Sequence, residues 1–215
     1  MKIAFLLFPD FTALDFVGPY EVLSRIPGAE LTFVGKETGP VRSDTGFLGL
    51  SIDATLEEVS DPDVVLVGGG HGNRPLLRDD EVIEWLRGAD EKTRWTTSVC
   101  TGALVLGAAG MLEGKRATTH WAYYDALRAY GAEPVAERWV IDGKYVTAAG
   151  VAAGIDMALA LTAEAYGEDV AKAIQLGIEY DPDPPFDSGS PKKATPELVE
   201  LVRQVEGGGA AESAG

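Results

Sequence analysis

Residues 95–109 have the sequence WTTSVCTGALVLGAA, in which a strand pattern runs directly into a cysteine and then into a helix pattern. Trp95–Val99 is typical of a strand that is buried on both faces. Thr101–Ala109 is small and apolar and predicts a helix. Cys100 stands between them, where a sharp strand-to-helix turn would present its side chain as in a nucleophile elbow. The segment therefore predicts an α/β fold with a reactive residue at the end of a strand.

The same alternation of strands and helices extends along the rest of the chain. Strands are expected at Ile3–Phe8, Leu31–Val34 and Val64–Val67, and helices at Leu14–Ile26, Asp79–Gly88, His120–Tyr130, Val151–Tyr166, Glu168–Glu179 and Pro196–Val205. Gly18-Pro19 is expected to bend or restart the first of these helices. Hairpins are expected around Asp44-Thr45-Gly46 and around Asp142-Gly143. The pattern predicts a mostly parallel central sheet with helices on both faces and a small β-hairpin addition.

No linker or repeat interrupts residues 1–205, which are expected to form a single domain. Within them, Tyr180–Pro191 is rich in Pro, Asp, Gly and Ser and predicts a loop. Residues 206–215 are mostly small and polar and are expected to form a disordered tail.

The composition restricts the class of protein and its partners. The chain has 215 residues, a net charge of −16, one cysteine (Cys100) and two histidines (His71 and His120). A single cysteine excludes an intrachain disulfide framework and a CxxC zinc site, and so few ligands disfavour any metal cluster. The negative charge disfavours nucleic acid and anionic membranes as partners. Because the apolar start Ala4–Phe8 is too short for a secretory signal, a cytoplasmic protein is expected.

Three features lie where predicted strands end, which is where α/β folds place their binding sites. They are Asp15, the glycine-rich loop Gly68–Gly72 and Cys100. Cys100 is either a nucleophile, whose thiolate the start of the following helix would favour, or an ordinary buried cysteine. Asp15 is either a carboxylate at a helix end or a proton donor and acceptor for Cys100.

The glycine loop and the histidines leave similar alternatives. The loop either only forms a turn or supplies the N–H groups of Gly69 and Gly70, which with that of Thr101 would form an oxyanion hole. It lacks the spacing of a nucleotide-binding motif. His120 is either a base partner for the thiol or a capping and packing residue. The remaining candidate pocket residues are His71, which faces either the pocket or water, and Gly150.

Two strings, Ser98–Gly102 and Ala117–Trp121, resemble the DJ-1/PfpI superfamily, and the resemblance extends from Lys2 to about Val205. It implies a flavodoxin-like three-layer α/β/α sandwich with a reactive cysteine at the elbow. Within the superfamily, the chain resembles the isonitrile (isocyanide) hydratases most. The strings that carry this narrower resemblance are Phe5–Pro9, Leu14-Asp15 with Gly18-Pro19, Ala117–Tyr123, Gly154–Asp156 and, most specifically, Glu179–Pro191.

The resemblance implies a role for each matching residue. Cys100 matches the nucleophile, Asp15 the acidic residue beside it, and Thr101 the residue whose hydroxyl and N–H point into the site. The backbone donors are matched by Gly69 and Gly70. The two histidines differ: His71 departs from the hydratases, which carry a smaller polar residue there, and His120 matches a histidine near the thiol in deglycase-like relatives.

The implied activity is hydration of an isonitrile to an N-substituted formamide, by thiolate attack with acid–base help from a carboxylate. No metal or organic cofactor is implied, the substrate is a small electrophile, and a homodimer is implied. One alternative is a glyoxalase- or deglycase-like enzyme that uses Cys100 with His120 on α-dicarbonyls or their adducts. Another is a non-enzymatic redox sensor in which Cys100 oxidises reversibly. The related AraC-type sensors are disfavoured, because too few residues follow Val205 for a helix-turn-helix module.

Overall fold

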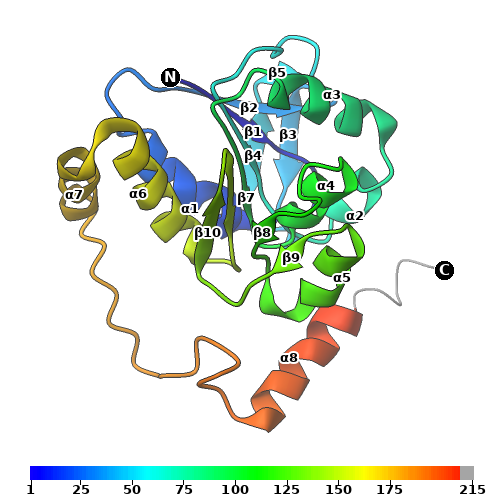
Figure 1. Ribbon diagram of the computed structural model, residues 1–215, viewed down its shortest axis with the longest axis vertical. Helices are drawn as coiled ribbons and strands as arrows, with labels where there is room; N and C mark the ends of the chain where they lie inside the picture. Colours follow the sequence, from blue (N-terminus) through cyan, green and yellow to red (C-terminus); the bar gives the residue numbers. More distant parts are fainter. Residues whose placement is uncertain (209–215) are drawn as a thin grey trace. The chain divides into compact units, whose positions relative to one another are not determined.

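The computed structural model describes residues 1–208, within which the chain divides into two compact units (Figure 1). The first unit spans Met1–Ile178, and the second begins at Glu179. The strands, all in the first unit, are β1 (Lys2–Leu6), β2 (Glu30–Gly35), β3 (Gly39–Arg42), β4 (Gly49–Ile52), β5 (Ala54–Thr55), β6 (Val64–Val67), β7 (Trp95–Val99), β8 (Arg116–Ala117), β9 (Glu133–Pro134), β10 (Trp139–Asp142) and β11 (Tyr145–Ala148). The helices of this unit are α1 (Ala13–Leu23), α2 (Asn73–Leu76), α3 (Asp80–Asp90), α4 (Gly102–Ala108), the 3-10 turn η1 (Trp121–Tyr123), α5 (Tyr124–Ala129), α6 (Ala153–Tyr166) and α7 (Glu168–Gly177).

A seven-stranded sheet in the order β10-β11-β7-β6-β1-β2-β5 forms the centre of the first unit. All of its strand pairs are parallel except the pair of β10 with β11. Helices α1 and α6 cover one face, with α7 packed on α6, and α3, α4 and α5 lie over the other (Figure 1). Strands β6 and β7 are buried along their whole length, because helices exclude water from both faces. The predicted three-layer architecture is confirmed.

Both predicted hairpins are present. Strands β3 and β4 pair antiparallel as a separate two-stranded sheet. Strands β10 and β11 join at Gly143-Lys144, one residue later than the expected turn, and Gly143 has a φ of 64° that glycine adopts without strain. This second hairpin extends the main sheet, whereas β3–β4 lies outside it, as does the short parallel pair of β8 and β9.

Helix α1 runs through Gly18-Pro19 without ending, so of the bend or restart expected there the restart does not occur. The reason is its packing on α6. A Cβ at Gly18 would lie 3.0 Å from a side-chain carbon of Ile155, and a Cβ at Gly154 would lie 3.0 Å from Pro19. The two helices approach so closely that tertiary contact holds the proline turn in helical form.

The helix expected at His120–Tyr130 instead begins as the 3-10 turn η1 and becomes α5 only at Tyr124. In the second unit, an irregular segment leads to α8 (Pro196–Gly208). This helix continues into the stretch that was expected to be a tail, and the rest of that tail, residues 209–215, lies outside the described residues. The expectation of one domain over residues 1–205 stays a prediction.

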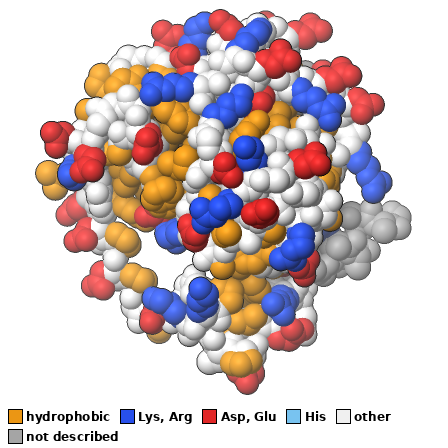
Figure 2. All heavy atoms as spheres, in the orientation of Figure 1, with side chains coloured by type: hydrophobic (Ala, Val, Ile, Leu, Met, Phe, Trp, Pro, Cys, Tyr) orange, Lys and Arg blue, Asp and Glu red, His pale blue; other side chains and the backbone are white. Residues whose placement is uncertain are grey.

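On the face that Figure 2 shows, acidic and basic side chains are interspersed rather than gathered by sign. This agrees with the spread of the negative charge along the sequence. Within residues 1–208, none of the helices combines the length and the apolar character needed to cross a membrane.

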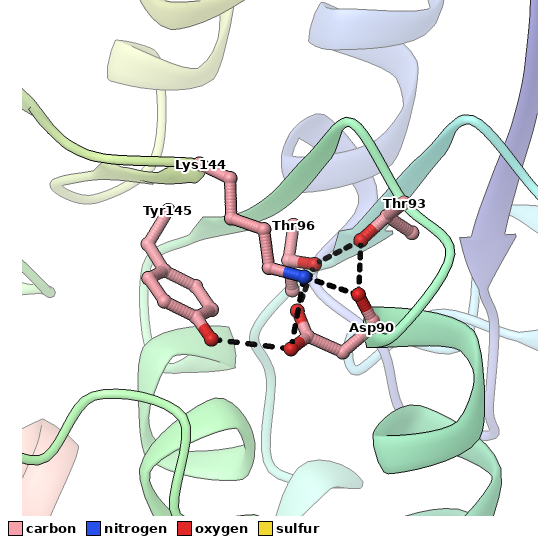
Figure 3. A network of polar contacts seen from close by, with 5 residues as sticks. All are labelled: Asp90, Thr93, Thr96, Lys144 and Tyr145. Atoms are coloured by element: carbon pink, nitrogen blue, oxygen red, sulfur yellow. Dashed lines mark hydrogen bonds and ion pairs between the residues drawn. The ribbon is translucent and has the colours of Figure 1, made fainter.

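A partly buried polar network ties together the amino-terminal ends of β7 and β11 (Figure 3). The Asp90 carboxylate accepts hydrogen bonds from the hydroxyls of Thr96 (2.6 Å) and Tyr145 (3.1 Å). Its Oδ2 also lies 3.1 Å from Lys144 Nζ, which donates to the Asp90 carbonyl as well. Thr93 donates to the same carbonyl at 3.1 Å. Burial and the neighbouring Asp90 carboxylate raise the pKa of Tyr145 to about 12, so the phenol remains a donor.

Asp90→Ala is expected to lower the free energy of unfolding by about 2–4 kcal/mol, because Lys144 would lose its counter-charge and two hydroxyls their acceptor. Urea unfolding followed by circular dichroism measures this. The matched control is Asp125→Ala, which removes an ion-paired carboxylate that is 98% exposed and is expected to cost at most about 1 kcal/mol. Equal losses in the two variants would contradict a structural role for the network.

Candidate active site

Cys100 occupies a strained strand-to-helix turn between β7 and α4. Its φ is +57°, a left-handed conformation that costs a non-glycine residue on the order of 1–2 kcal/mol. Three hydrogen bonds hold this backbone. The Cys100 N–H donates to the carbonyls of Ala148 (3.1 Å) and Ala149 (3.2 Å), and the Thr119 hydroxyl donates to the Cys100 carbonyl (2.8 Å). The elbow expected from the sequence is present, and its cysteine is only 7% exposed.

Gly102, in the first turn of α4, allows this helix to approach the sheet. A Cβ at this position would lie 2.0 Å from the carbonyl oxygen of Val67 in β6, which is closer than any real contact. Only glycine therefore permits α4 to start directly behind Cys100. The helix and the strand therefore approach each other closely at this glycine.

Asp15, near the start of α1, is a fully buried carboxyl next to the cysteine. Its Oδ2 accepts a hydrogen bond of 2.7 Å from the Gly69 N–H, and the Cys100 side chain is hydrogen-bonded to the same carboxyl. Burial raises the pKa of Asp15 to about 8, with a smaller contribution from the charge of Asp44, while the bonds from Gly69 and Cys100 act in the opposite direction. Among residues 1–208, Oδ1 has no oxygen or nitrogen partner. Asp15 is thus an acid that still holds its proton at neutral pH.

The glycine loop after β6 holds the acid and the threonine in place. The Gly69 N–H is committed to Asp15, and the Gly70 N–H donates to Thr101 Oγ1 at 3.3 Å. Of the two alternatives that the sequence left open for this loop, an oxyanion hole would need both amides to face a substrate. In this structure both amides instead donate to side chains of the site. A Cβ on Gly69 would lie 2.6 Å from Thr101 Oγ1 and 2.9 Å from Asp15 Oδ2, so glycine is needed where the loop passes between them.

His120 and Gly150 lie against each other. A Cβ on Gly150 would be 2.4 Å from His120 Cδ2, so the imidazole packs directly on the backbone that follows β11. The Nδ1 of His120 accepts a hydrogen bond of 3.4 Å from the Ala122 N–H at the start of η1. The ring also lies 5.4 Å from the ring of Trp121 and 5.9 Å from that of Tyr123. These contacts are those of a capping and packing histidine.

His71 lies in the glycine loop, and its side chain is exposed. Of the two readings left open by the sequence, the structure therefore supports the one in which it faces water. Its backbone carbonyl accepts from the Arg74 N–H at 3.4 Å, which is a turn contact. Among the described residues, no three His, Cys, Asp or Glu side chains are grouped to hold a metal ion.

Sequence reasoning missed Asn73, the first residue of α2. Its side chain is 3% exposed, and its Nδ2 donates a hydrogen bond of 2.8 Å to Thr101 Oγ1. The only signal in the sequence was an amide residue directly after the glycine loop. The site therefore combines a cysteine, a neutral acid and a threonine held by two donors.

Comparisons with known proteins identify the relatives of this chain. The model of the DJ-1/PfpI family matches residues 1–164. Isonitrile hydratase from Pseudomonas putida is 48% identical over 204 residues, which cover 95% of this chain and 89% of that protein. The HTH-type transcriptional regulator CdhR from Pseudomonas aeruginosa is 34% identical over 184 residues, which cover 82% of this chain but only 53% of the regulator.

Solved structures lead to the same family. The crystal structure of a ThiJ/PfpI family protein from Pseudomonas syringae superposes with a TM-score of 0.92 at 38% identity. The match covers 95% of this chain and 85% of that one. The central sheet and its two helical layers are thus those of the flavodoxin-like fold of this family. On the family match, the close relatives and the superposition, this chain belongs to the DJ-1/PfpI family.

Proposed function

We propose that this protein is an isonitrile hydratase, which converts R–N≡C and water into the formamide R–NH–CHO. The observation that carries the proposal is the fully buried Asp15 carboxyl, hydrogen-bonded to Cys100 and with its pKa raised to about 8. The reaction needs a nucleophile and a group that gives and takes a proton beside it, and these two side chains supply both. The identity of 48% to isonitrile hydratase from Pseudomonas putida supports the same activity.

In the first step, the Cys100 thiolate attacks the terminal carbon of the isonitrile and a C–S bond forms. The addition moves one π pair of the triple bond onto nitrogen, while the carbon keeps its own lone pair with a negative charge and must be protonated. The Asp15 carboxylic acid gives its proton to this carbon. The product is a thioformimidate, R–N=CH–S–Cys100, and Asp15 is left as a carboxylate.

In the second step, water adds to the thioformimidate carbon. Asp15 removes one proton from the water and passes it to the nitrogen, which gives R–NH–CH(OH)–S–Cys100. Asp15 then takes the hydroxyl proton while the C–S bond breaks. The formamide leaves, and both the thiolate and the protonated carboxyl are restored. A carboxyl with a pKa near 8 suits this cycle, because it both gives and takes a proton near neutral pH.

The alternative chemistries have less support. Deglycase-like chemistry would use His120 as the base, but Nδ1 of this ring accepts from the Ala122 N–H and the ring is packed against Gly150. A redox sensor needs a cysteine that oxidants reach, and Cys100 is 7% exposed. The implied homodimer stays a prediction.

Purified protein is expected to convert p-nitrophenyl isocyanide into the corresponding formamide, and Cys100→Ala is expected to abolish this conversion. The appearance of the formamide is followed by absorbance. The control variant is Lys172→Ala, which removes an exposed side chain paired with Glu168 on α7 and is expected to leave turnover unchanged. Methylglyoxal serves as a control substrate. Consumption of methylglyoxal without formation of formamide would contradict the proposal and favour the glyoxalase-like alternative.

Asp15→Asn is expected to lower kcat by about 10²–10⁴-fold, because the amide cannot exchange a proton with the substrate carbon. The same change is expected to stabilise the protein increasingly between about pH 4 and pH 8. An unfolded chain ionises Asp15 near its ordinary pKa of 3.8, whereas the folded protein holds the proton up to about pH 8. Wild-type stability from this group is therefore complete below pH 4 and is lost as the pH rises towards 8.

Urea unfolding of both proteins at several pH values measures this effect. The free energy of unfolding of Asp15→Asn should rise relative to that of the wild type by up to about 1.4 kcal/mol for each pH unit in this window, and the difference should level off above it. A difference that does not change with pH would show that Asp15 is ionised in the folded protein.

A further inference from the structure

The hydroxyl of Thr101 accepts two hydrogen bonds from fixed donors. One comes from Asn73 Nδ2 at 2.8 Å, and the other from the Gly70 N–H at 3.3 Å. A threonine hydroxyl has two acceptor positions and one proton to donate. Since both acceptor positions are filled, this hydroxyl acts only as a donor.

Thr101 Oγ1 is the acceptor in both of its hydrogen bonds. Among residues 1–208, the hydroxyl proton therefore has no acceptor. The oxygen lies in the active site, because Thr101 directly follows Cys100. A Cβ built on Gly69 would lie 2.6 Å from Thr101 Oγ1 and 2.9 Å from Asp15 Oδ2, so the hydroxyl and the acid both border this glycine. A buried donor without a partner, beside a nucleophile and an acid, is suited to a ligand atom.

We propose that Asn73 is a positioning residue, which makes Thr101 a one-way donor to the nitrogen of the reacting substrate. This inference rests on the proposed isonitrile hydratase activity. Asn73 is itself buried, and its amide is the only side chain among residues 1–208 that donates to Thr101 Oγ1. Without this amide, the hydroxyl could turn and accept instead of donate.

The chemistry of the substrate explains why such a donor would act on turnover. The nitrogen of an isonitrile has no lone pair, because all of its electrons are in bonds. A lone pair appears on nitrogen only after the thiolate has added and the thioformimidate has formed. A hydrogen bond from Thr101 to this lone pair draws electrons from the carbon and favours the attack of water. The bond exists in the intermediate and not in the bound isonitrile, so it raises kcat and leaves KM largely unchanged.

The test compares Asn73→Asp with Asn73→Leu in the full-length protein, with p-nitrophenyl isocyanide as substrate. Asp has nearly the shape of Asn but accepts a hydrogen bond, so it would draw the Thr101 proton away from the substrate. Leu removes the donor without offering an acceptor. We expect kcat to fall about 10-fold or more in Asn73→Asp, towards the 100- to 1,000-fold typical of deleting such a donor, and less in Asn73→Leu. KM should change little in either variant.

The same two changes are then made in a Thr101→Val background, and urea unfolding is measured for all variants. Thr101 makes no side-chain cap to α4, so its replacement leaves the start of that helix intact. If Asn73 acts through the hydroxyl, Asn73→Asp should have almost no further effect on kcat once Thr101 is valine.

Two results would overturn the inference while leaving the proposed function in place. One is an undiminished effect of Asn73→Asp in the Thr101→Val background, which would assign the effect to the added charge. The other is a loss of kcat that follows the loss of stability, with Asn73→Leu the worse variant. An inactive wild-type protein would overturn the proposed function and this inference together.

Discussion

The site depends on the burial of one carboxyl, Asp15, which no cation among residues 1–208 neutralises. A carboxylate in such surroundings loses its hydration, and the amide of Gly69 and the side chain of Cys100 replace only part of it. The group therefore keeps its proton to about pH 8. Three neighbouring features accommodate this acid. Gly69 leaves room for it, the start of α1 carries it, and the turn at Cys100 places the thiol beside it.

The elbow is held by the sheet rather than by its own sequence. A left-handed cysteine is unfavourable alone, and the bonds to Ala148, Ala149 and Thr119 offset the strain. Strands β7 and β11 are joined at both ends. Cys100 sits at their carboxyl ends, and the Asp90 network ties Thr96 to Tyr145 at their amino ends (Figure 3). The charged network, with its carboxylate paired to Lys144, is thus kept a strand length away from the neutral acid.

The order of strands and helices, the two hairpins and the position of Cys100 could be predicted because each depends on local pattern: apolar runs, turn residues and a cysteine between them. The hydrogen bonds that orient the side chains of the site could not be predicted in this way. Asn73 and Thr101 are separated by 28 residues, and Asp15 and Gly69 by 54, so their hydrogen bonds arise only when β1, β6 and β7 align. The continuity of α1 through Pro19 likewise depends on contact with α6, which no local pattern contains.

The charge of the whole chain and the state of Asp15 are consistent with one kind of substrate. A protein with a net charge of −16 repels anions and favours the protonated form of its acids. Asp44 contributes to this at close range by raising the pKa of Asp15. A neutral electrophile, such as the isonitrile of the proposed function, would enter without electrostatic penalty and would meet an acid that still has its proton to give. A carboxylate or phosphate substrate would be repelled by the negative surface. It would also find the N–H groups of Gly69 and Gly70 already hydrogen-bonded to Asp15 and Thr101. Under the proposed function, the burial and negative surroundings that keep Asp15 protonated would therefore also favour an uncharged reactant.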